Sequence, residues 1–383
     1  MAKATNPFVV SGRIEPEYFC DRQAETAKLK KSLSNGNNVT IMAPWGMGKQ
    51  KLVQSFCDLP EIKDNCYTFN LDISCITDFE DFVYRLGYEI YRVLKDKPGN
   101  ESSIFINYLD SIYKKLPQQD YHRIFCLKKG EIEYPELLLN EIFNYLRQGN
   151  KRCIITLNEF QKIADYQENN VEALLHGQIQ KTDNCNFIYI CSDWQKTQSM
   201  FLSGNRPFYM SAETLELKAI PKKTYSTFVS EKFHEYGKRI SQDSIGIVYD
   251  TFKGNTFYMQ RIFNDVFAST EKGALCSKEM IETSINEITE SYEALFKERL
   301  RIMNKYDKEV LFAIAQENQI EETELHNLAC KYSLHSTDFV RSHITSLLKS
   351  QIITNVNCVY SVGNQFFRLW LVTHMDSLKK QIK

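Results

Sequence analysis

The first half of the chain alternates short apolar runs with longer stretches of helical spacing. Four runs rich in β-branched or aromatic residues are typical of strands buried on both faces: Val39–Met42, Cys66–Leu71, Cys153–Leu157 and Phe187–Cys191. A fifth run of similar character spans Thr214–Ile220. Helical spacing separates the runs, at Gln50–Cys57, Phe79–Leu94 and Tyr134–Leu146. This alternation predicts an α/β fold with a parallel sheet.

Two later segments differ from this pattern. The stretch Pro98–Pro135 is polar and irregular, and we expect it to cover one edge of the sheet. From Pro221 to about residue 304 the apolar spacing is helical throughout, with a predicted helix end at Gly254. Ser277 predicts the start of a long helix. The apolar stripe of that helix would comprise Ile281, Ile285, Ile288, Tyr292 and Leu295.

The last segment, about 305–372, reads as three helices followed by two short β runs. The second helix is predicted at Glu322–Lys331, and Ser336 is placed to cap the third. The β runs Ile352–Thr354 and Val359–Val362 are separated by a short turn. This order predicts a winged helix.

The most informative segment joins a predicted strand to a predicted helix through a loop. The loop and its continuation read Ala43, Pro44, Trp45, Gly46, Met47, Gly48, Lys49, Gln50 and Lys51. In a P-loop, backbone N–H groups and the positive end of the helix face an anion, and the lysine reaches the terminal phosphates. We therefore predict that these nine residues bind the phosphates of a nucleotide, with Ala43 in place of the first glycine of the motif.

Two positions that would hold magnesium are altered. The P-loop motif ends in a serine or threonine hydroxyl that binds Mg²⁺, and Gln50 stands there. A buried strand ending in Asp-Glu would supply a second ligand, but this chain has Asn158 and Glu159. A neutral amide lacks the negative charge that a divalent cation needs. We therefore predict no metal site, with Glu159 in the water-activating position if the chain hydrolyses nucleotide.

Composition narrows the class of protein. The net charge of −1 gives no overall attraction to nucleic acid or to an anionic membrane. The 11 cysteines are an odd number without a C-x-x-C pair, which indicates reduced thiols rather than disulfides or a zinc site. No apolar run is long enough to span a membrane, and residues 1–13 lack the apolar region of a signal peptide. We expect a cytoplasmic protein with no membrane partner.

Taken together, these elements resemble the archaeal-type ATPases, a branch of the STAND relatives of AAA+ proteins. The segments that carry the resemblance are Asn6–Phe8, Phe19–Glu25, the P-loop, Asn158–Gln161, Pro207–Glu213 and Phe367–Leu371. The resemblance implies a P-loop NTPase core at 1–220, a helical lid at 221–304 and a C-terminal winged-helix domain at 305–383. It also implies an adenine nucleotide, ATP or ADP, with Asn6–Phe8 and Phe19–Glu25 beside the adenine.

The chain departs from this family at four places in one site. Relatives carry threonine where Gln50 stands and aspartate where Asn158 stands. They also tend to carry basic residues in the P-loop, where this chain has Trp45 and Gly46, and after the following strand, where it has Asp193 and Trp194. An arginine there would stabilise charge developing on the γ-phosphate. We therefore expect weak or absent hydrolysis, and binding of Mg²⁺ is doubtful.

Three functions remain open. The first is a regulatory pseudo-ATPase, in which ATP or ADP joins core and lid and sets a conformation recognised by a protein partner. The second is a slow ATPase that recruits Mg²⁺ through Glu159 and water, with a winged helix that binds DNA or protein. The third is a nucleotide-free interaction scaffold. Lys49 favours the first two, because a scaffold does not need it.

The predicted winged helix carries little positive charge for DNA. Its third helix contributes Arg341, His343 and Lys349, next to Asp338. The segment 297–383 has 12 Lys/Arg against 9 Asp/Glu, which is little for neutralising a phosphate backbone. DNA therefore remains a weakly supported partner, and we expect this domain to pack on the nucleotide domain.

Overall fold

The computed structural model describes residues 5–97, 99–110, 134–168 and 170–382. By their contacts, the residues form two compact units. The sheet unit is Arg22–Lys218, and the helical unit combines Met1–Asp21 with Ala219–Lys383. The predicted boundary between residues 304 and 305 falls inside the helical unit, so the division into three domains stays a prediction.

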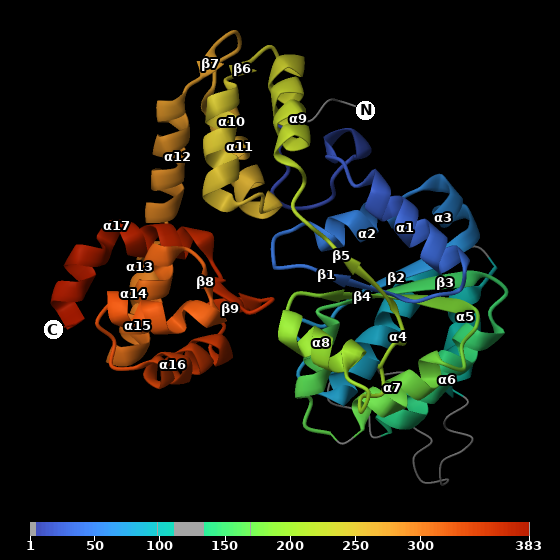
Figure 1. Ribbon diagram of the computed structural model, residues 1–383. Coiled ribbons are helices and arrows are strands. Elements are labelled where there is room, and N and C mark those ends of the chain that lie inside the picture. The colour runs from blue at the N-terminus through green and yellow to red at the C-terminus, as the bar shows by residue number, and fades with distance from the viewer. Residues whose placement is uncertain (1–4, 98, 111–133, 169, 383) are drawn as a thin grey trace. The chain divides into compact units, whose positions relative to one another are not determined.

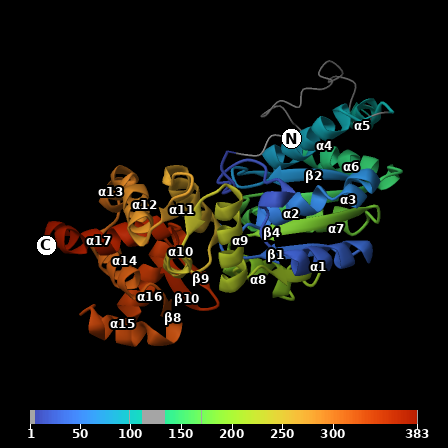
Figure 2. The same cartoon turned by 90° about the horizontal axis from the view of Figure 1, so that it is seen from above.

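The sheet unit is built on five parallel strands in the order β2-β3-β4-β1-β5 (Figure 1). The strands are β1 (Val39–Met42), β2 (Cys66–Asp72), β3 (Arg152–Asn158), β4 (Cys185–Cys191) and β5 (Glu213–Glu216). Viewed from above, they run side by side with β2 at one edge (Figure 2). Every residue of β1 and β4 is buried, as expected for strands covered on both faces. The predicted α/β fold with a parallel sheet is confirmed.

Helices cover both faces of this sheet. They are α1 (Gln23–Ser34), α2 (Lys49–Cys57), α3 (Pro60–Asn65), α4 (Phe79–Lys95), α5 (Glu101–Asp110), α6 (Pro135–Gln148), α7 (Val171–Ile179) and α8 (Trp194–Leu202), with a 3₁₀ helix η4 (Phe160–Asp165). Figure 1 shows α1, α2 and α3 on one face and α4, α6 and α7 on the other. Because β4 pairs in parallel with both β3 and β1, the carboxyl ends of β1, β3 and β4 meet at one edge.

The prediction of an irregular stretch at Pro98–Pro135 was wrong for its first part. Residues Glu101–Asp110 form α5, which packs against α4 and α6. Phe105 and Leu109, one helical turn apart, are both buried, and they anchor one face of a short helix that also carries polar residues. Residues 111–133 of the predicted stretch lie outside the described residues.

The helical unit begins with a 3₁₀ helix and a group of helices. They are η1 (Pro16–Tyr18), α9 (Lys222–Glu235), α10 (Gln242–Phe252), α11 (Thr256–Ser269), α12 (Lys278–Glu290) and α13 (Glu293–Arg301). Two short strands, β6 (Arg239–Ile240) and β7 (Leu275–Cys276), pair in parallel within this group, so the prediction of helices alone was wrong there. Gly254, with φ of +73°, follows the end of α10 as predicted.

The long helix predicted from Ser277 is interrupted. Its start is confirmed, because the Ser277 side chain caps α12. The helix ends at Glu290, and the hydroxyl of Ser291 donates to the carbonyl of Ile288 at 2.7 Å. A serine hydroxyl that bonds its own helix backbone competes with continued helix. Leu295 is therefore not on the buried stripe but is 67% exposed, and Phe296 is buried in α13 instead.

The remaining elements of the helical unit follow the order predicted for a winged helix. They are α14 (Lys305–Glu317), β8 (Ile320–Glu321), η5 (Glu322–Glu324), α15 (Leu325–Lys331), α16 (Thr337–Lys349), β9 (Ile353–Val356), β10 (Val359–Val362) and α17 (Gln365–Ile382). Ser336 caps α16 as predicted. The β9–β10 hairpin turns through Asn357 and Cys358, both with positive φ, as in the two-residue turns that match strand twist.

The N-terminal segment packs inside the helical unit, although the predicted core domain began at residue 1. The ring of Phe8 is fully buried and lies 5.6 Å from the rings of Phe233 and Phe263. The side chain of Asn6 donates to the Asn264 carbonyl at 2.8 Å, and that of Asn264 donates to the Phe8 carbonyl at 2.6 Å. These contacts tie the first residues of the unit to α11.

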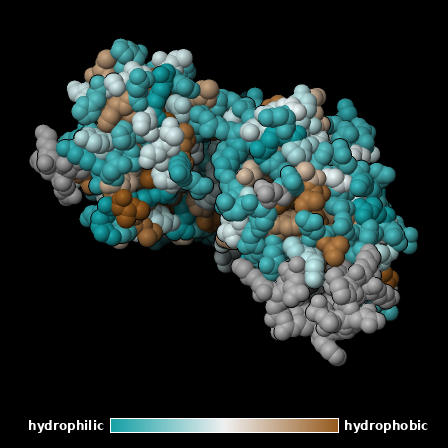
Figure 3. All heavy atoms as spheres, turned by 90° about the horizontal axis from the view of Figure 1, so that it is seen from below, coloured by the Kyte–Doolittle hydropathy of each residue, from teal (hydrophilic) through white to brown (hydrophobic). Residues whose placement is uncertain are grey.

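The face shown in Figure 3 is mostly hydrophilic, with scattered apolar residues. Among the described residues, no helix combines the length and the apolar character needed to cross a bilayer. The ten cysteines in the described part of the chain have free thiols. The cytoplasmic location stays a prediction.

Candidate phosphate-binding site

The predicted phosphate-binding loop connects β1 to α2. Gly46 and Gly48 both have φ of +85°, in the left-handed region that glycine enters at little cost. Gly48 is the N-cap of α2, so the first N–H groups of that helix open toward the loop. Ala43 does not have a positive φ, and its side chain is buried. Alanine is therefore tolerated where the motif has its first glycine.

Lys49 is the cation of this loop, and its side chain is almost fully buried. Its ammonium group donates to the carbonyls of Ala43 at 2.6 Å and Pro44 at 3.0 Å. Burial lowers the pKa of Lys49 to about 8, partly offset by the negative charge of Glu159. The lysine is thus folded back over the loop with its charge inside it, beside the N-terminus of α2.

The other predicted loop residues differ in exposure. Met47 is buried, whereas Trp45 is 56% exposed and Gln50 is exposed. Lys51 lies on the first turn of α2, and burial lowers the pKa of its ammonium group. The structure therefore brings the nine predicted residues into one strand–loop–helix segment, in which Lys49 alone directs a charge into the loop.

The predicted second element lies at the end of β3. Asn158 is its last residue and is buried. Glu159 follows with φ of +57°. The Glu159 carboxylate accepts a hydrogen bond from the Ser192 hydroxyl at 2.5 Å and another from the Gln161 amide at 2.7 Å. Both oxygens of this carboxylate are thus held by neutral donors.

The loop and the strand ends belong to one cluster. The Ala43 N–H donates to the carbonyl of Cys191, the last residue of β4, at 3.4 Å. Ser192, the next residue, bonds Glu159 from β3. Sequence reasoning missed Ser192 and gave no role to Gln161. The available signal was position, because both follow the carboxyl ends of buried strands, where ligands bind in open α/β sheets.

The donor groups at this edge do not fit a magnesium ion. The two positions that would ligate it carry neutral amides, and Gln50 is exposed whereas Asn158 is buried. Hard divalent cations prefer carboxylate, carbonyl and water oxygens, and negative charge is needed to offset the cost of dehydration. In the described part of the chain, no group of three His, Cys, Asp or Glu side chains could hold a metal ion.

The residues after β4 also lack a cation that could meet a phosphate. Asp193 is the N-cap of α8, and its carboxylate accepts from the Lys196 N–H at 3.0 Å. The Lys196 ammonium is paired with Asp165 at 2.5 Å. Trp194 begins the helix. Asp193 therefore has a structural role and adds negative charge at this edge.

The predicted segment before the P-loop contains a buried arginine. Arg22 has φ of +79° and is 5% exposed. Its guanidinium donates to the carboxylate of Glu25 and to the carbonyl of Lys218, both at 2.8 Å. It therefore joins the two ends of the sheet unit. The position of this segment beside an adenine stays a prediction.

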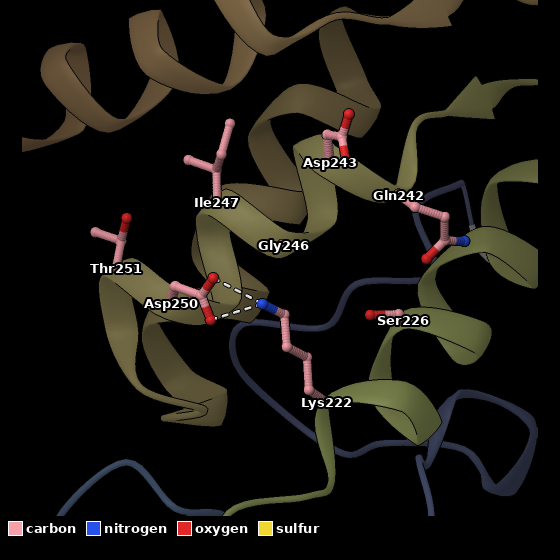
Figure 4. A pocket seen from close by; sticks show the side chains of 8 residues that line it. All are labelled: Lys222, Ser226, Gln242, Asp243, Gly246, Ile247, Asp250 and Thr251. Carbon is pink, nitrogen blue, oxygen red and sulfur yellow. Dashed lines mark hydrogen bonds and ion pairs between the residues drawn. The ribbon is translucent and has the colours of Figure 1, made fainter.

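The helical unit carries an open groove of about 700 Å³ along α9 and α10 (Figure 4). The Lys222 ammonium crosses the groove to the carboxylate of Asp250 at 2.6 Å, close to the backbone of Gly246. None of the predicted site residues lines it. With its main cation already paired with a carboxylate, the groove offers no evident site for a nucleotide.

Comparison with solved structures identifies the fold. The Walker-type ATPase of Pyrococcus abyssi is 15% identical with a TM-score of 0.66, over 96% of this chain and 99% of the other. The ORC2 protein of Aeropyrum pernix, solved as ADPNP–ADP complexes, is 12% identical with a TM-score of 0.55, over 98% of each chain. The ORC1 protein of the same organism, solved in complex with DNA, is 11% identical with a TM-score of 0.52, over 99% of this chain and 98% of the other. This chain has the fold of the Walker-type ATPases.

The C-terminal part of this ATPase fold matches a family described as "Probable winged helix domain" over residues 294–373. The match includes α14, α15, α16 and the β9–β10 hairpin. The predicted likeness to archaeal ATPases that end in a winged helix is therefore confirmed at the level of fold. No curated protein matches the chain.

Proposed function

We propose that this chain binds an adenine nucleotide, ATP or ADP, through residues 43–51 and uses it as a structural or conformational element of a regulatory protein. The observation that carries the proposal is the buried Lys49 ammonium at the N-terminus of α2, combined with neutral amides at Gln50 and Asn158. The neighbour solved as ADPNP–ADP complexes supports nucleotide as the ligand.

Phosphate binding by this loop needs no metal. The N–H groups that open the helix and the positive end of α2 attract an anion. The Lys49 ammonium would exchange its bonds to the Ala43 and Pro44 carbonyls for bonds to phosphate oxygens. A charge-assisted hydrogen bond to phosphate is stronger than one to a neutral carbonyl, so the exchange favours the bound state.

Hydrolysis is poorly supported by the same residues. A metal that bridges two phosphates supplies much of the charge stabilisation in phosphoryl transfer, and the amides of Gln50 and Asn158 do not fit one. The Glu159 carboxylate already accepts one hydrogen bond on each oxygen, from Ser192 and from Gln161. We therefore expect ATP turnover to be absent or very slow.

Titration calorimetry of the full chain with ADP, in Mg²⁺ and in EDTA, tests the proposal. Because the loop binds phosphate with backbone N–H groups and Lys49, we expect the two dissociation constants to agree within about twofold. A large loss of ADP affinity in EDTA would contradict metal-independent binding. Heat-denatured protein analysed by mass spectrometry would show whether nucleotide is retained through purification.

DNA is a weaker candidate partner, although one neighbour was solved in complex with DNA. On α16, Arg341 is 3.6 Å from the carboxylate of Asp338, and His343 bonds Asp307 at 2.6 Å. Two of the three basic groups of this helix therefore face carboxylates. We expect no tight duplex binding in fluorescence anisotropy at physiological salt; a nanomolar, salt-sensitive affinity would contradict this.

A further inference from the structure

The edge of the sheet beside the phosphate-binding loop holds the Lys49 ammonium and a fixed anion. The anion is the Glu159 carboxylate, bonded by the Ser192 hydroxyl at 2.5 Å and the Gln161 amide at 2.7 Å. Gln161 is buried, and Glu159 has a left-handed backbone directly after β3. Held on both oxygens, this carboxylate has little freedom to swing away, and its neutral donors do not cancel its charge.

The cation is Lys49, and hydrogen bonds link it to the carboxylate: the Lys49 ammonium bonds the Ala43 carbonyl, the Ala43 N–H bonds the carbonyl of Cys191, and the next residue, Ser192, bonds Glu159. Burial lowers the pKa of Lys49, and the opposing effect of Glu159 is the largest from any charged neighbour. Asp193 adds a second carboxylate directly after β4, and Lys196 one turn later is already paired with Asp165. The carboxylates of Glu159 and Asp193 thus offset the positive charge of Lys49 at this edge before any ligand binds.

The number of phosphates on the nucleotide should therefore affect its affinity for this site. In a P-loop the lysine reaches the β- and γ-phosphates. A γ-phosphate beside Lys49 would also come close to Glu159, and it would add negative charge. The neutral amides of Gln50 and Asn158 do not fit a metal ion that could lie between the γ-phosphate and the Glu159 carboxylate. Like charges in a partly desolvated site repel each other strongly.

We propose that this site selects a nucleoside diphosphate over a triphosphate, and that Glu159 sets the selection by repelling the γ-phosphate. The inference rests on the proposed nucleotide site, and it assigns Glu159 a role other than orienting water. The position that would orient water in an active ATPase becomes a specificity-determining position in this chain.

The experiment compares ADP with ATP by titration calorimetry in EDTA, using the full chain. We expect ADP to bind at least about tenfold more tightly than ATP. The variant Glu159→Gln keeps the size of the side chain and removes its charge. It should bring the ATP affinity to within about threefold of the ADP affinity, with ADP binding little changed. Glu61→Gln, which removes an exposed carboxylate on α3, should leave the preference intact.

A second measurement does not depend on the folding of a variant. Raising the salt concentration screens repulsion between charges, so the preference of the wild-type protein for ADP should narrow as salt rises. Equal affinities for ADP and ATP in EDTA would overturn the inference and leave the proposed nucleotide site standing. A preference for ADP that persists in folded Glu159→Gln would overturn the role of Glu159. Failure of both nucleotides to bind would instead overturn the proposed function.

Discussion

The phosphate-binding loop and the end of strand β3 meet at one edge of the sheet, but they depend on different parts of the chain. In the loop, the backbone carries the function, through the left-handed Gly46 and Gly48 and the open end of α2. At the end of β3, a metal site would depend on the charge of one side chain, and Asn158 lacks it. A loop of backbone N–H groups therefore tolerates substitutions around it, whereas a metal site is lost with a single carboxylate.

The largest expected effect comes from the one side chain on which the loop does depend. Lys49→Ala removes the buried ammonium, and we expect ADP affinity in calorimetry to fall at least about 100-fold, the effect of a lost charge-assisted contact. Lys63→Ala, at an exposed lysine on α3, is the matched control and should bind as wild type does. Unchanged binding by Lys49→Ala would show that the nucleotide lies elsewhere.

Restoring the two lost metal ligands should have a smaller effect than removing Lys49. Gln50→Thr with Asn158→Asp should raise Mg²⁺-dependent phosphate release about tenfold or more, and by more than the product of the two single changes, because each alone leaves the ion short of a ligand. Steady-state turnover of wild type, both single variants and the double variant decides this. Robust Mg²⁺-dependent turnover by wild type that Lys49→Ala abolishes would contradict the loss of the metal site.

The single variant Asn158→Asp offers a further check on the same strand end. Asn158 is 4% exposed, and a buried carboxylate without a partner is costly, by roughly 1–3 kcal/mol. We expect thermal unfolding to shift to lower temperature in EDTA. Recovery of that loss on adding Mg²⁺ to the double variant would indicate that the restored ligands bind the ion.

The smallest expected effect is a pH dependence of nucleotide binding by the loop. Lys49 is protonated below its pKa of about 8 and loses its charge as pH rises through that value, so phosphate binding should weaken in the alkaline direction. Between pH 7 and 8.5, ADP affinity in EDTA should fall about fourfold. Lys49→Arg keeps its charge over this range and should flatten the profile. A wild-type affinity that rises with pH would contradict the assignment.

The sequence predicted the sheet and the phosphate-binding loop because both depend on local signals. The runs that became β1 and β4 are rich in β-branched and aromatic residues, and Gly46, Gly48 and Lys49 lie within four residues of one another. The α5 helix was missed because only two of its residues, Phe105 and Leu109, are buried. Its contacts with α4 and α6 are not visible in its own pattern.

The environment of Glu159 could not be predicted for a similar reason. Ser192 is 33 residues away in sequence, and the two meet only because β4 pairs with β3. The sequence identified the position of Glu159 by its place after an apolar strand. Which groups hold its carboxylate depends in part on Ser192, which the fold brings in from a neighbouring strand end.

The packing of Phe8 in the helical unit has a consequence for the order of events during synthesis. The sheet unit, Arg22–Lys218, is an insertion within the helical unit, so its residues leave the ribosome after Met1–Asp21 and before Ala219–Lys383. Phe8 must wait for its ring partners Phe233, Phe263 and Phe267, more than 200 residues later. The nascent chain thus carries an unsatisfied apolar N-terminus while the sheet forms, and closing so long a loop makes its docking a late step.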